Sequence, residues 1–407
     1  MKCRHCNTEL THLFCDLQTC PPSNAMVKEG ELNFPETYFP LSTLVCEKCW
    51  LVQVDELEKA EDIFNDEYTY FSSFSTSWLA HAKRYTDSMV DRFGFNEQSL
   101  IVEIASNDGY LLQYFKEKNI PVLGVEPTAN TAAVAAEKGI ESIVDFFGSK
   151  LADAQLKTKA DLILGNNVLA HVPDINDFVK GVKIALKPNG VNTFEFPHLC
   201  KLVEFNQFDT IYHEHFSYLS LTALKTIFEA QGLTIFDVEE LPTHGGSLRI
   251  FTQHSDFKDR KIENSVEKIL QNEANLGVNQ IGYYSNFQEK VESIKDDCLR
   301  FLLDAKAEGK KVIGYGAAAK GNTLLNFSGV KGTDLISFVV DASPFKQGKY
   351  LPGSRIPVVS KNQIEIYQPD YIIIFPWNLK NEIEEQLFYC KTWGAKFVVF
   401  VPKLTIS

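Results

Sequence analysis

Two cysteine pairs near the N-terminus constrain the fold of this chain more than any other feature. Cys3-x-x-Cys6 and Cys46-x-x-Cys49 are separated by 39 residues. Each pair can turn two thiolates toward one cation, and together they supply the four-sulfur tetrahedron that Zn²⁺ prefers. Four protein ligands leave no open position for water. The spacing therefore predicts a structural zinc in a small N-terminal head.

The other cysteines agree with a metal-binding head in a reducing compartment. Six of the nine cysteines fall in the first 49 residues, and the N-terminal stretch lacks the apolar core of a signal peptide. We therefore expect a cytoplasmic protein, in which such clusters bind metal more often than they form disulfides. Residues that compete with the two pairs as zinc ligands are Cys15, Cys20, His5 and His12.

Length and charge narrow the class of protein further. The 407 residues allow two or three domains, and 44% hydrophobic residues suffice for their cores. The net charge, 40 − 53 = −13, argues against a nucleic-acid-binding protein, which needs a basic surface. No stretch approaches 18 consecutive apolar residues, so no membrane partner is expected. The oligomeric state is left open by the sequence.

The middle of the chain alternates between strand and helix patterns. After a helical stretch at 78–93, buried strands are predicted at 100–105, 122–125 and 161–165, with a helix at 110–118. A turn at 187–190 leads into another strand at 191–195. This alternation predicts a parallel sheet with helices on both faces, which binds ligands at the carboxyl ends of its strands.

The first turn of this unit distinguishes between nucleotides. A dinucleotide site needs G-x-G-x-x-G, whereas the turn at 106–109 has one glycine, and Asp108 would repel a diphosphate. Glu126, at the end of the second strand, suits two ribose hydroxyls. The pattern favours S-adenosylmethionine. Expected cofactor contacts are Glu103, Ser106, Asn107, Asp108, Glu126 and Asn166, with Glu103 either touching the cofactor or orienting the loop.

A histidine-rich segment follows. Tyr212-His213-Glu214-His215 places four proton-handling side chains in a row, and His171 follows the strand at 161–165. A neutral histidine suits a general base near neutral pH. The alternatives are a second zinc site and a structural histidine pair. The glycines of His244-Gly245-Gly246 permit a close backbone approach, so that loop either lines the substrate cleft or braces a turn before the strand at 247–252.

The last third contains a second α/β pattern. Residues 255–308 have a helical period and predict a connector, followed by strands at 311–315, 336–340 and 371–375. The turn around Gly314-x-Gly316 and Lys320 could receive a diphosphate at a helix N-terminus. Dinucleotide binding is the competing interpretation.

Long motifs give the chain a specific resemblance. They are Glu103-Ile104-Ala105-Ser106-Asn107-Asp108-Gly109, Asn166-Asn167-Val168-Leu169-Ala170-His171-Val172, Phe208-Asp209-Thr210-Ile211-Tyr212-His213-Glu214-His215, His244-Gly245-Gly246-Ser247-Leu248-Arg249 and Gly314-Tyr315-Gly316-Ala317-Ala318-Ala319-Lys320-Gly321-Asn322. With the cysteine pairs, they make the chain similar to the S-adenosylmethionine-dependent sugar C-methyltransferases. That family adds a branch methyl group to nucleotide-linked 4-keto-deoxysugars. Ala105 departs from the glycine that is frequent there.

The resemblance implies an α/β fold in three parts. These are an N-terminal zinc-binding head (1–72), a class I, Rossmann-like methyltransferase domain (73–255), and a connector with a second Rossmann-like domain for the substrate nucleotide (256–407). The implied reaction is methyl transfer to a carbon, at C-3, next to the keto group. The alternatives are an O-methyltransferase on a related sugar and a non-catalytic binding module on this fold.

The resemblance also implies roles for individual residues. His215 is the expected base and Glu214 its orienting or charge-setting partner. Tyr212 and His171 are expected to donate to the keto oxygen or its enolate, and Tyr70 is a further catalytic candidate. A nucleotide-diphosphate sugar is the expected partner. Candidate groups for binding it are His244, Lys320 and Asn322, with Lys346 and Lys349 as weaker candidates.

Overall fold

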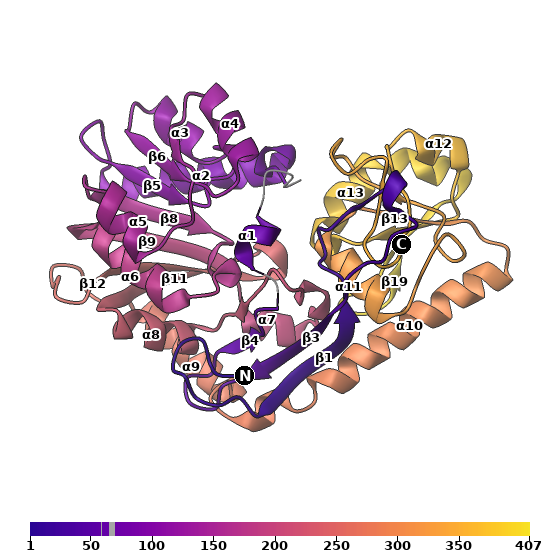
Figure 1. The fold of residues 1–407 in the computed structure, drawn as a ribbon, viewed down its shortest axis with the longest axis horizontal. Helices are drawn as coiled ribbons and strands as arrows, with labels where there is room; N and C mark the ends of the chain where they lie inside the picture. Colours follow the sequence, from indigo (N-terminus) through magenta and orange to yellow (C-terminus); the bar gives the residue numbers. More distant parts are fainter. Residues whose placement is uncertain (58, 65–69) are drawn as a thin grey trace.

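The protein consists of two α/β lobes that stand on a common base of strands and a long helix (Figure 1). The structure is a computed structural model, which describes residues 1–57, 59–64 and 70–407. Tyr68 and Thr69, which precede the catalytic candidate Tyr70, lie outside this range. Three main sheets have four, seven and six strands, and a two-stranded ribbon joins the base to the C-terminal lobe.

The N-terminal head contributes most of the base. Its antiparallel sheet has the order β1-β3-β4-β10. Three of these strands belong to the head: β1 (His12–Cys20), β3 (Phe39–Val45) and β4 (Val52–Val54). The fourth, β10 (Ser217–Tyr218), follows β9 of the first lobe in the chain. Other short elements of this region are η1 (Glu29–Glu31), α1 (Ala60–Ile63) and η2 (Ser72–Phe74). The sheet of the head is therefore completed by a distant part of the chain.

The first lobe is built on the seven-stranded sheet, with the order β11-β12-β9-β8-β5-β6-β7. Its strands are β5 (Ile101–Ile104), β6 (Val122–Val125), β7 (Ser142–Ile143), β8 (Ala160–Asn166), β9 (Leu186–Pro197), β11 (Leu233–Leu241) and β12 (Ser247–His254). Five neighbouring strands are parallel, as predicted, but β12 is antiparallel to β9 and β11. The predicted turn at 187–190 is an irregularity inside β9, between the partners of Ala160 and Leu162.

Helices cover both faces of this sheet because its buried strands are apolar on both sides. In β5, Ile101 belongs to the hydrophobic cluster that contains residues of α2 and α3, and the adjacent Val102 belongs to the cluster that contains residues of α5, α6 and α8. The helices are α2 (Thr76–Phe93), α3 (Leu112–Glu117), α4 (Ala129–Glu137), α5 (Ser149–Gln155), α6 (Ile175–Ala185), α7 (Leu199–Glu204) and α8 (Leu221–Ala230). Helix α2 ends at Gly94, whose φ of 71° suits the left-handed helix cap.

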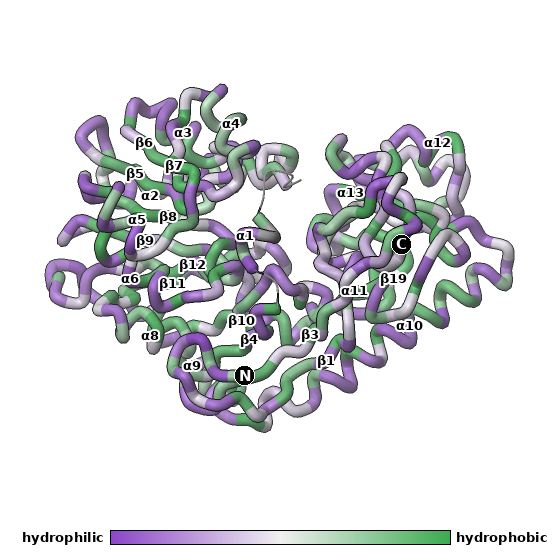
Figure 2. Tube along the Cα trace, in the orientation of Figure 1, coloured by the Kyte–Doolittle hydropathy of each residue, from purple (hydrophilic) through white to green (hydrophobic). Residues whose placement is uncertain are grey.

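Two helices connect the lobes, in agreement with the predicted connector. They are α9 (Asn264–Leu276) and α10 (Phe287–Ala307), with η6 (Ile281–Tyr284) between them. Along α10, hydrophobic and hydrophilic residues alternate (Figure 2). Its buried side joins the head to the C-terminal lobe, and Phe287 stacks on Phe14 of β1 with ring centroids 4.6 Å apart. No helix in the described part of the chain has the length and apolar character needed to cross a membrane.

The second lobe has a six-stranded sheet with the order β16-β14-β13-β17-β18-β19, parallel except at β19. Its elements are β13 (Val312–Tyr315), α11 (Ala319–Phe327), β14 (Val339–Val340), β16 (Val358–Val359), α12 (Gln363–Tyr367), β17 (Tyr371–Ile374), η7 (Trp377–Leu379), α13 (Lys380–Gln386), η8 (Phe388–Trp393), β18 (Lys396–Val399) and β19 (Thr405–Ile406). Beside it, β2 (Val27–Lys28) pairs with β15 (Lys349–Tyr350). The fold expected from the sequence, a zinc-binding head and two Rossmann-like units, is confirmed.

Candidate active site

The cofactor turn follows β5 and is held by a carboxylate of the next strand. Glu126 accepts hydrogen bonds from the backbone N–H of Asn107 at 2.8 Å and of Thr128 at 2.9 Å. Gly124 has room only for hydrogen, since a Cβ there would lie 2.4 Å from Ser106 Oγ. Ala105 has a φ of 56°, a left-handed conformation that glycine adopts at lower cost.

Several buried polar atoms at this turn lack a partner among the described residues. They include the hydroxyl of Ser106 and Oδ1 of Asp108. Glu103 is fully buried, and burial raises its carboxyl pKa well above its ordinary value. Buried polar groups normally have partners. These groups therefore fit a polar ligand without phosphates, and they suit S-adenosylmethionine, the cofactor of this fold.

Asn107 and Asn166 also contribute to this end of the sheet. Asn107 Oδ1 accepts from the Ser72 N–H at 2.9 Å, and its Nδ2 donates to the carbonyl of Tyr70 at 3.1 Å. Asn166 Nδ2 donates to the hydroxyl of Tyr110 at 3.3 Å. The structure thus brings Tyr70 to the cofactor turn through its backbone, and its side chain is 48% exposed.

The histidine-rich segment follows η4 (Phe208–Thr210) as a turn, and it fixes the tautomer of His215. Nδ1 of His215 lies 2.9 Å from the carbonyl oxygen of Thr210, which can only accept, so Nδ1 carries the proton. Nε2 then carries the basic lone pair, and the Tyr212 hydroxyl donates a hydrogen bond to it at 2.6 Å. The sequence did not reveal that a backbone carbonyl orients this ring.

His171, in η3 (Leu169–His171), lies against His215 with ring centroids 4.6 Å apart. Burial lowers the pKa of His171 to about 4, and the backbone of Glu214 opposes this shift. Burial also lowers the pKa of His215 well below its ordinary value; His171 and Lys320 lower it further, and the Thr210 carbonyl opposes the change. Both imidazoles are therefore neutral at pH 7, as a proton acceptor has to be.

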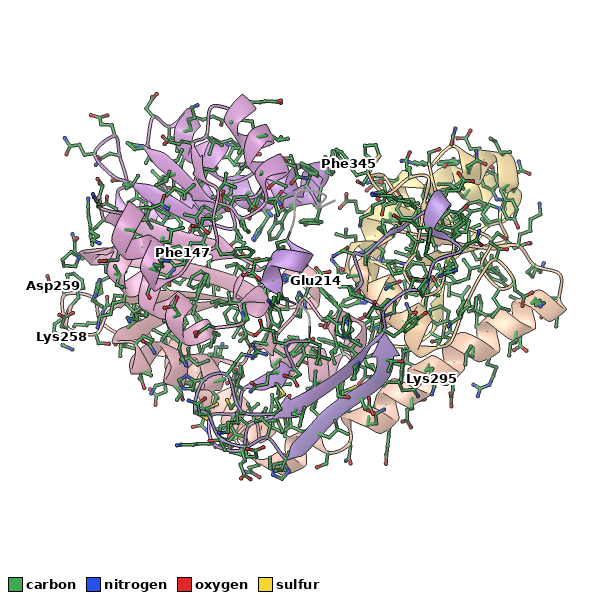
Figure 3. The ribbon with its side chains drawn as sticks, in the orientation of Figure 1. Phe147, Glu214, Lys258, Asp259, Lys295 and Phe345 are labelled. Atoms are coloured by element: carbon green, nitrogen blue, oxygen red, sulfur yellow. The ribbon has the colours of Figure 1, made fainter. Side chains whose placement is uncertain are left out.

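Glu214 is placed differently from the sequence-based expectation. It lies between the two lobes above the head (Figure 3), and it is 2% exposed. Both of its carboxylate oxygens accept from Nδ2 of Asn24 in the head, at 2.7 and 2.8 Å. The orienting contact at His215 Nδ1 belongs to the carbonyl of Thr210 rather than to Glu214. The neighbouring His213 donates from Nε2 to the carbonyl of Pro40, 3.1 Å away.

The loop of His244 closes the same region. His244 has a φ of 52°, and its Nε2 accepts from Nδ2 of Asn167 at 2.8 Å. A Cβ on Gly245 would lie 2.4 Å from the ring of Trp377 in the second lobe. Burial lowers the pKa of His244 to about 4, and Lys320 adds to that effect. The loop thus brings both lobes close to the candidate base.

A buried cluster under this loop was not found from the sequence. Glu195 accepts from His81 Nε2 at 2.8 Å, Arg249 Nη2 at 2.6 Å and Thr243 Oγ1 at 2.7 Å. These partners hold the pKa of Glu195 at about 2 although burial alone would raise it. Trp78 packs on both His81 and His244. In the sequence, only Arg249, at the end of the motif at 244–249, pointed to this cluster.

Lys320 lies at the boundary between the lobes. Its ammonium nitrogen donates to Asn378 Oδ1 at 2.7 Å and sits 4.2 Å from the ring centroid of Trp377, whose indole N–H donates to Asp209 at 2.7 Å. Burial lowers the pKa of Lys320 to about 8, against the opposing effect of Asp209, whose own pKa burial raises to about 7. Asn322 is fully buried, and both of its side-chain polar atoms lack a partner among the described residues.

The zinc ligands expected from the sequence converge. Sulfur separations are 3.5 Å for Cys3–Cys49 and Cys6–Cys46, and 3.7 Å for Cys6–Cys49. A tetrahedron with Zn–S bonds of about 2.3 Å has edges of roughly 3.8 Å, so one zinc fits at the centre. Cys15 and Cys20, both in β1, belong instead to a hydrophobic core cluster. His5 forms a hydrogen bond with Asn176, and His12 forms one with Glu47.

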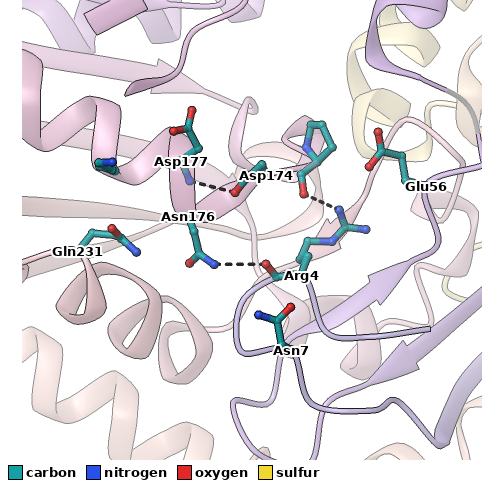
Figure 4. Close-up of a pocket in the computed structure, with 9 residues that line it drawn as sticks. Arg4, Asn7, Glu56, Asp174, Asn176, Asp177 and Gln231 are labelled. Atoms are coloured by element: carbon teal, nitrogen blue, oxygen red, sulfur yellow. Dashed lines mark hydrogen bonds between the residues drawn. The ribbon is translucent and has the colours of Figure 1, made fainter. Parts of the chain in front are cut away.

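Two further features do not belong to these sites. His198, Cys200 and Glu273 also lie close together, but both oxygens of Glu273 already accept hydrogen bonds at the start of α8. A cavity of about 620 Å³ lies between the head and α6 and is lined by Arg4, Glu56 and Asn176, among others (Figure 4). None of the candidate catalytic or cofactor residues lines it.

Comparisons with known proteins cover most of the chain. Family models match residues 3–64 as a zinc binding domain, 78–238 as a methyltransferase domain and 242–402 as a C-methyltransferase C-terminal domain. The chain is 36% identical to the C-methyltransferase NovU of Streptomyces niveus over 371 residues, which span 90% of this chain and 87% of that protein.

Three further proteins are similar over smaller shares of the chain. A ubiquinone biosynthesis O-methyltransferase of Nitrobacter winogradskyi is 30% identical over 115 residues, covering 26% of this chain and 44% of that protein. A methyltransferase structure from Clostridium acetobutylicum covers 43% of this chain and 92% of its own, at 11% identity and a TM-score of 0.35. A magnesium protoporphyrin IX methyltransferase structure from Synechocystis covers 44% of this chain and 82% of its own, at 16% identity and a TM-score of 0.33.

The similarity that spans nearly the whole chain is with a C-methyltransferase, whereas the O-methyltransferase matches about a quarter of it. The 36% identity to a C-methyltransferase over 90% of the chain also argues against a non-catalytic binding module. With three family models in the expected order, a four-cysteine zinc site and a turn suited to S-adenosylmethionine, this chain belongs to the C-methyltransferase family.

Proposed function

We propose that this enzyme methylates the carbon next to the keto group, C-3, of a nucleotide-linked 4-keto-deoxysugar, with His215 as the base. The observation that carries the proposal is the relay from the Thr210 carbonyl through His215 to the Tyr212 hydroxyl. It gives a neutral imidazole one basic nitrogen of defined direction, which is the group needed to remove a proton next to a carbonyl.

In the proposed reaction, the Tyr212 hydroxyl moves its hydrogen bond from Nε2 to the keto oxygen of the sugar. Nε2 then takes the C-3 proton, and the electron pair of the C–H bond moves to form the enolate. His171 and Tyr212 donate to the oxygen on which negative charge develops. S-adenosylmethionine, when bound, would supply the methyl group to C-3 of the enolate, and its sulfur would keep the electron pair of the broken S–C bond and leave as S-adenosylhomocysteine.

The charged and polar groups around this relay have complementary roles in the proposal. Glu214 offsets the positive charge that His215 acquires, and Tyr70 borders the site from the cofactor turn. Lys320 supplies positive charge on the side of the second lobe, where the diphosphate of the substrate carries negative charge. His244 and Asn322 are further candidate substrate contacts, and Asn322 would have to turn toward the ligand because it is fully buried.

A screen of nucleotide-linked 4-keto sugars with isotope-labelled S-adenosylmethionine tests the function. We expect a methyl group on C-3, identified by NMR, and exchange of the C-3 proton with deuterated solvent without the methyl donor. NAD is omitted throughout, because the reaction requires no hydride carrier. Methylation on oxygen, or no product from any such sugar with an enzyme that binds the methyl donor, would contradict the proposal.

Glu126→Gln is expected to weaken S-adenosylmethionine binding by about 10- to 100-fold, the loss expected for hydrogen bonds to a charged group. The amide keeps the shape of the carboxylate, but it has only one oxygen, so it accepts hydrogen bonds from two ribose hydroxyls less well. Isothermal titration calorimetry measures the affinity, with the exposed Glu141→Gln as the matched control. Equal affinity for the variant and the wild type would remove Glu126 from the cofactor site.

A further inference from the structure

The catalytic turn is held from outside by the head and by the second lobe. On its N-terminal side, Thr323 of α11 donates to the carbonyl of Ile211 at 3.0 Å. On its C-terminal side, Ser217 and Tyr218 pair with Gln53 and Val52 of β4. The turn between them contains Tyr212 and His215, so its conformation depends on contacts with two other parts of the chain.

Asn24 makes the most specific of these contacts. It lies in the turn between β1 and β2, and its Nδ2 is within 2.8 Å of both oxygens of Glu214, 190 residues away. The turn is fixed on one side by β1 in the head sheet. On the other side it is fixed by β2, which pairs with β15 of the second lobe. Asn24 therefore presents its amide from a frame that involves both the head and the second lobe.

We propose that Asn24 is a positioning residue for the reaction: it holds the buried Glu214 carboxylate in place in the turn that contains the candidate base. This inference rests on the function proposed above. A buried carboxylate requires hydrogen-bond donors. An amide meets that need without neutralising the charge, whereas Lys or Arg would form an ion pair. Asn24 thereby fixes the position of Glu214 in the turn that contains His215.

A swap of donor and acceptor tests the contact without any substrate. Asn24→Asp places two carboxylates together and is expected to lower the melting temperature of the zinc-loaded full chain. In the double variant Asn24→Asp/Glu214→Gln, the amide donates in the opposite direction, so we expect the melting temperature to recover. Exposed Asn33→Asp is the matched control for the added charge. Additive losses in the double variant would overturn the proposed contact.

Kinetics then test whether Asn24 acts through Glu214. Asn24→Ala is expected to lower kcat by about 10- to 100-fold, the loss of one hydrogen bond to a charged group, with the KM for S-adenosylmethionine unchanged. In a Glu214→Gln background, the same substitution is expected to lower kcat by less than about twofold. Zinc content and cofactor affinity confirm that each variant is folded. An equal fold-loss in both backgrounds would mean that Asn24 serves only the structure.

The two experiments separate this inference from the proposed function. If the wild-type chain methylates no 4-keto sugar, the function is wrong, while the melting temperatures still decide whether Asn24 holds Glu214. If methylation is observed but the donor–acceptor swap is not rescued, the function stands and the role of Asn24 is wrong.

Discussion

His215→Asn is expected to lower methyl transfer by at least about 1,000-fold and to abolish solvent deuterium exchange at C-3 of the sugar, within the range typical of a lost general base. Asparagine keeps a polar side chain of similar reach but has no basic nitrogen. Initial rates with labelled methyl donor measure the first effect, and NMR of the sugar in deuterated solvent measures the second. Loss of exchange is the decisive result, because it reports proton removal alone.

The matched control for this prediction is His12→Asn, at a partly exposed histidine paired with Glu47 in the head. It is expected to leave both rates unchanged. Because the pKa of His215 is lowered, its neutral form persists as the pH falls below 6.5, so the wild-type rate should not decline around that pH through this group. Normal deuterium exchange in His215→Asn would remove His215 as the base.

Loss of zinc is expected to inactivate the enzyme even though none of the four cysteine ligands is a candidate catalytic residue. A structural Zn²⁺ contributes on the order of 10 kcal/mol to folding, as much as the total stability of many domains. Cys46→Ser should therefore lower the zinc content from one per chain, lower the melting temperature and abolish turnover. Unfolding the head would release β4 from β10 and Asn24 from Glu214.

Metal analysis by mass spectrometry, calorimetry and rate measurements check this prediction together. Cys390→Ala, at a buried cysteine of the second lobe, is the control and should retain one zinc per chain. A zinc-free chain with full activity would contradict the link between the head and the catalytic turn.

Local patterns predicted the strands and the turn of the candidate cofactor site. The buried strand ending at Ile104, its single-glycine turn and Glu126 at the end of the next strand are within 30 residues of one another, and parallel pairing brings them to one sheet edge. The cysteine pairs were equally informative, because zinc geometry allows few arrangements of four sulfurs.

The contacts around the candidate base could not be predicted in the same way. Asn24 and Glu214 are 190 residues apart, and Trp377 and Asp209 are 168 apart. No periodicity connects residues on separate elements at such distances; only the packing of the head and both lobes brings them together. The role of the Thr210 carbonyl was hidden for another reason, since a backbone acceptor has no residue type that a sequence pattern could reveal.

The strand β10 has a consequence for how such enzymes can be recombined. Residues 1–57, taken as a fragment, leave β4 with an unpaired edge, which favours aggregation. Exchanging the head between two relatives would also separate Gln53 and Val52 from the Ser217 and Tyr218 with which they pair. A folded chimera therefore needs the head and the 208–218 segment from the same relative. These two parts are far apart in the sequence but adjacent in the structure.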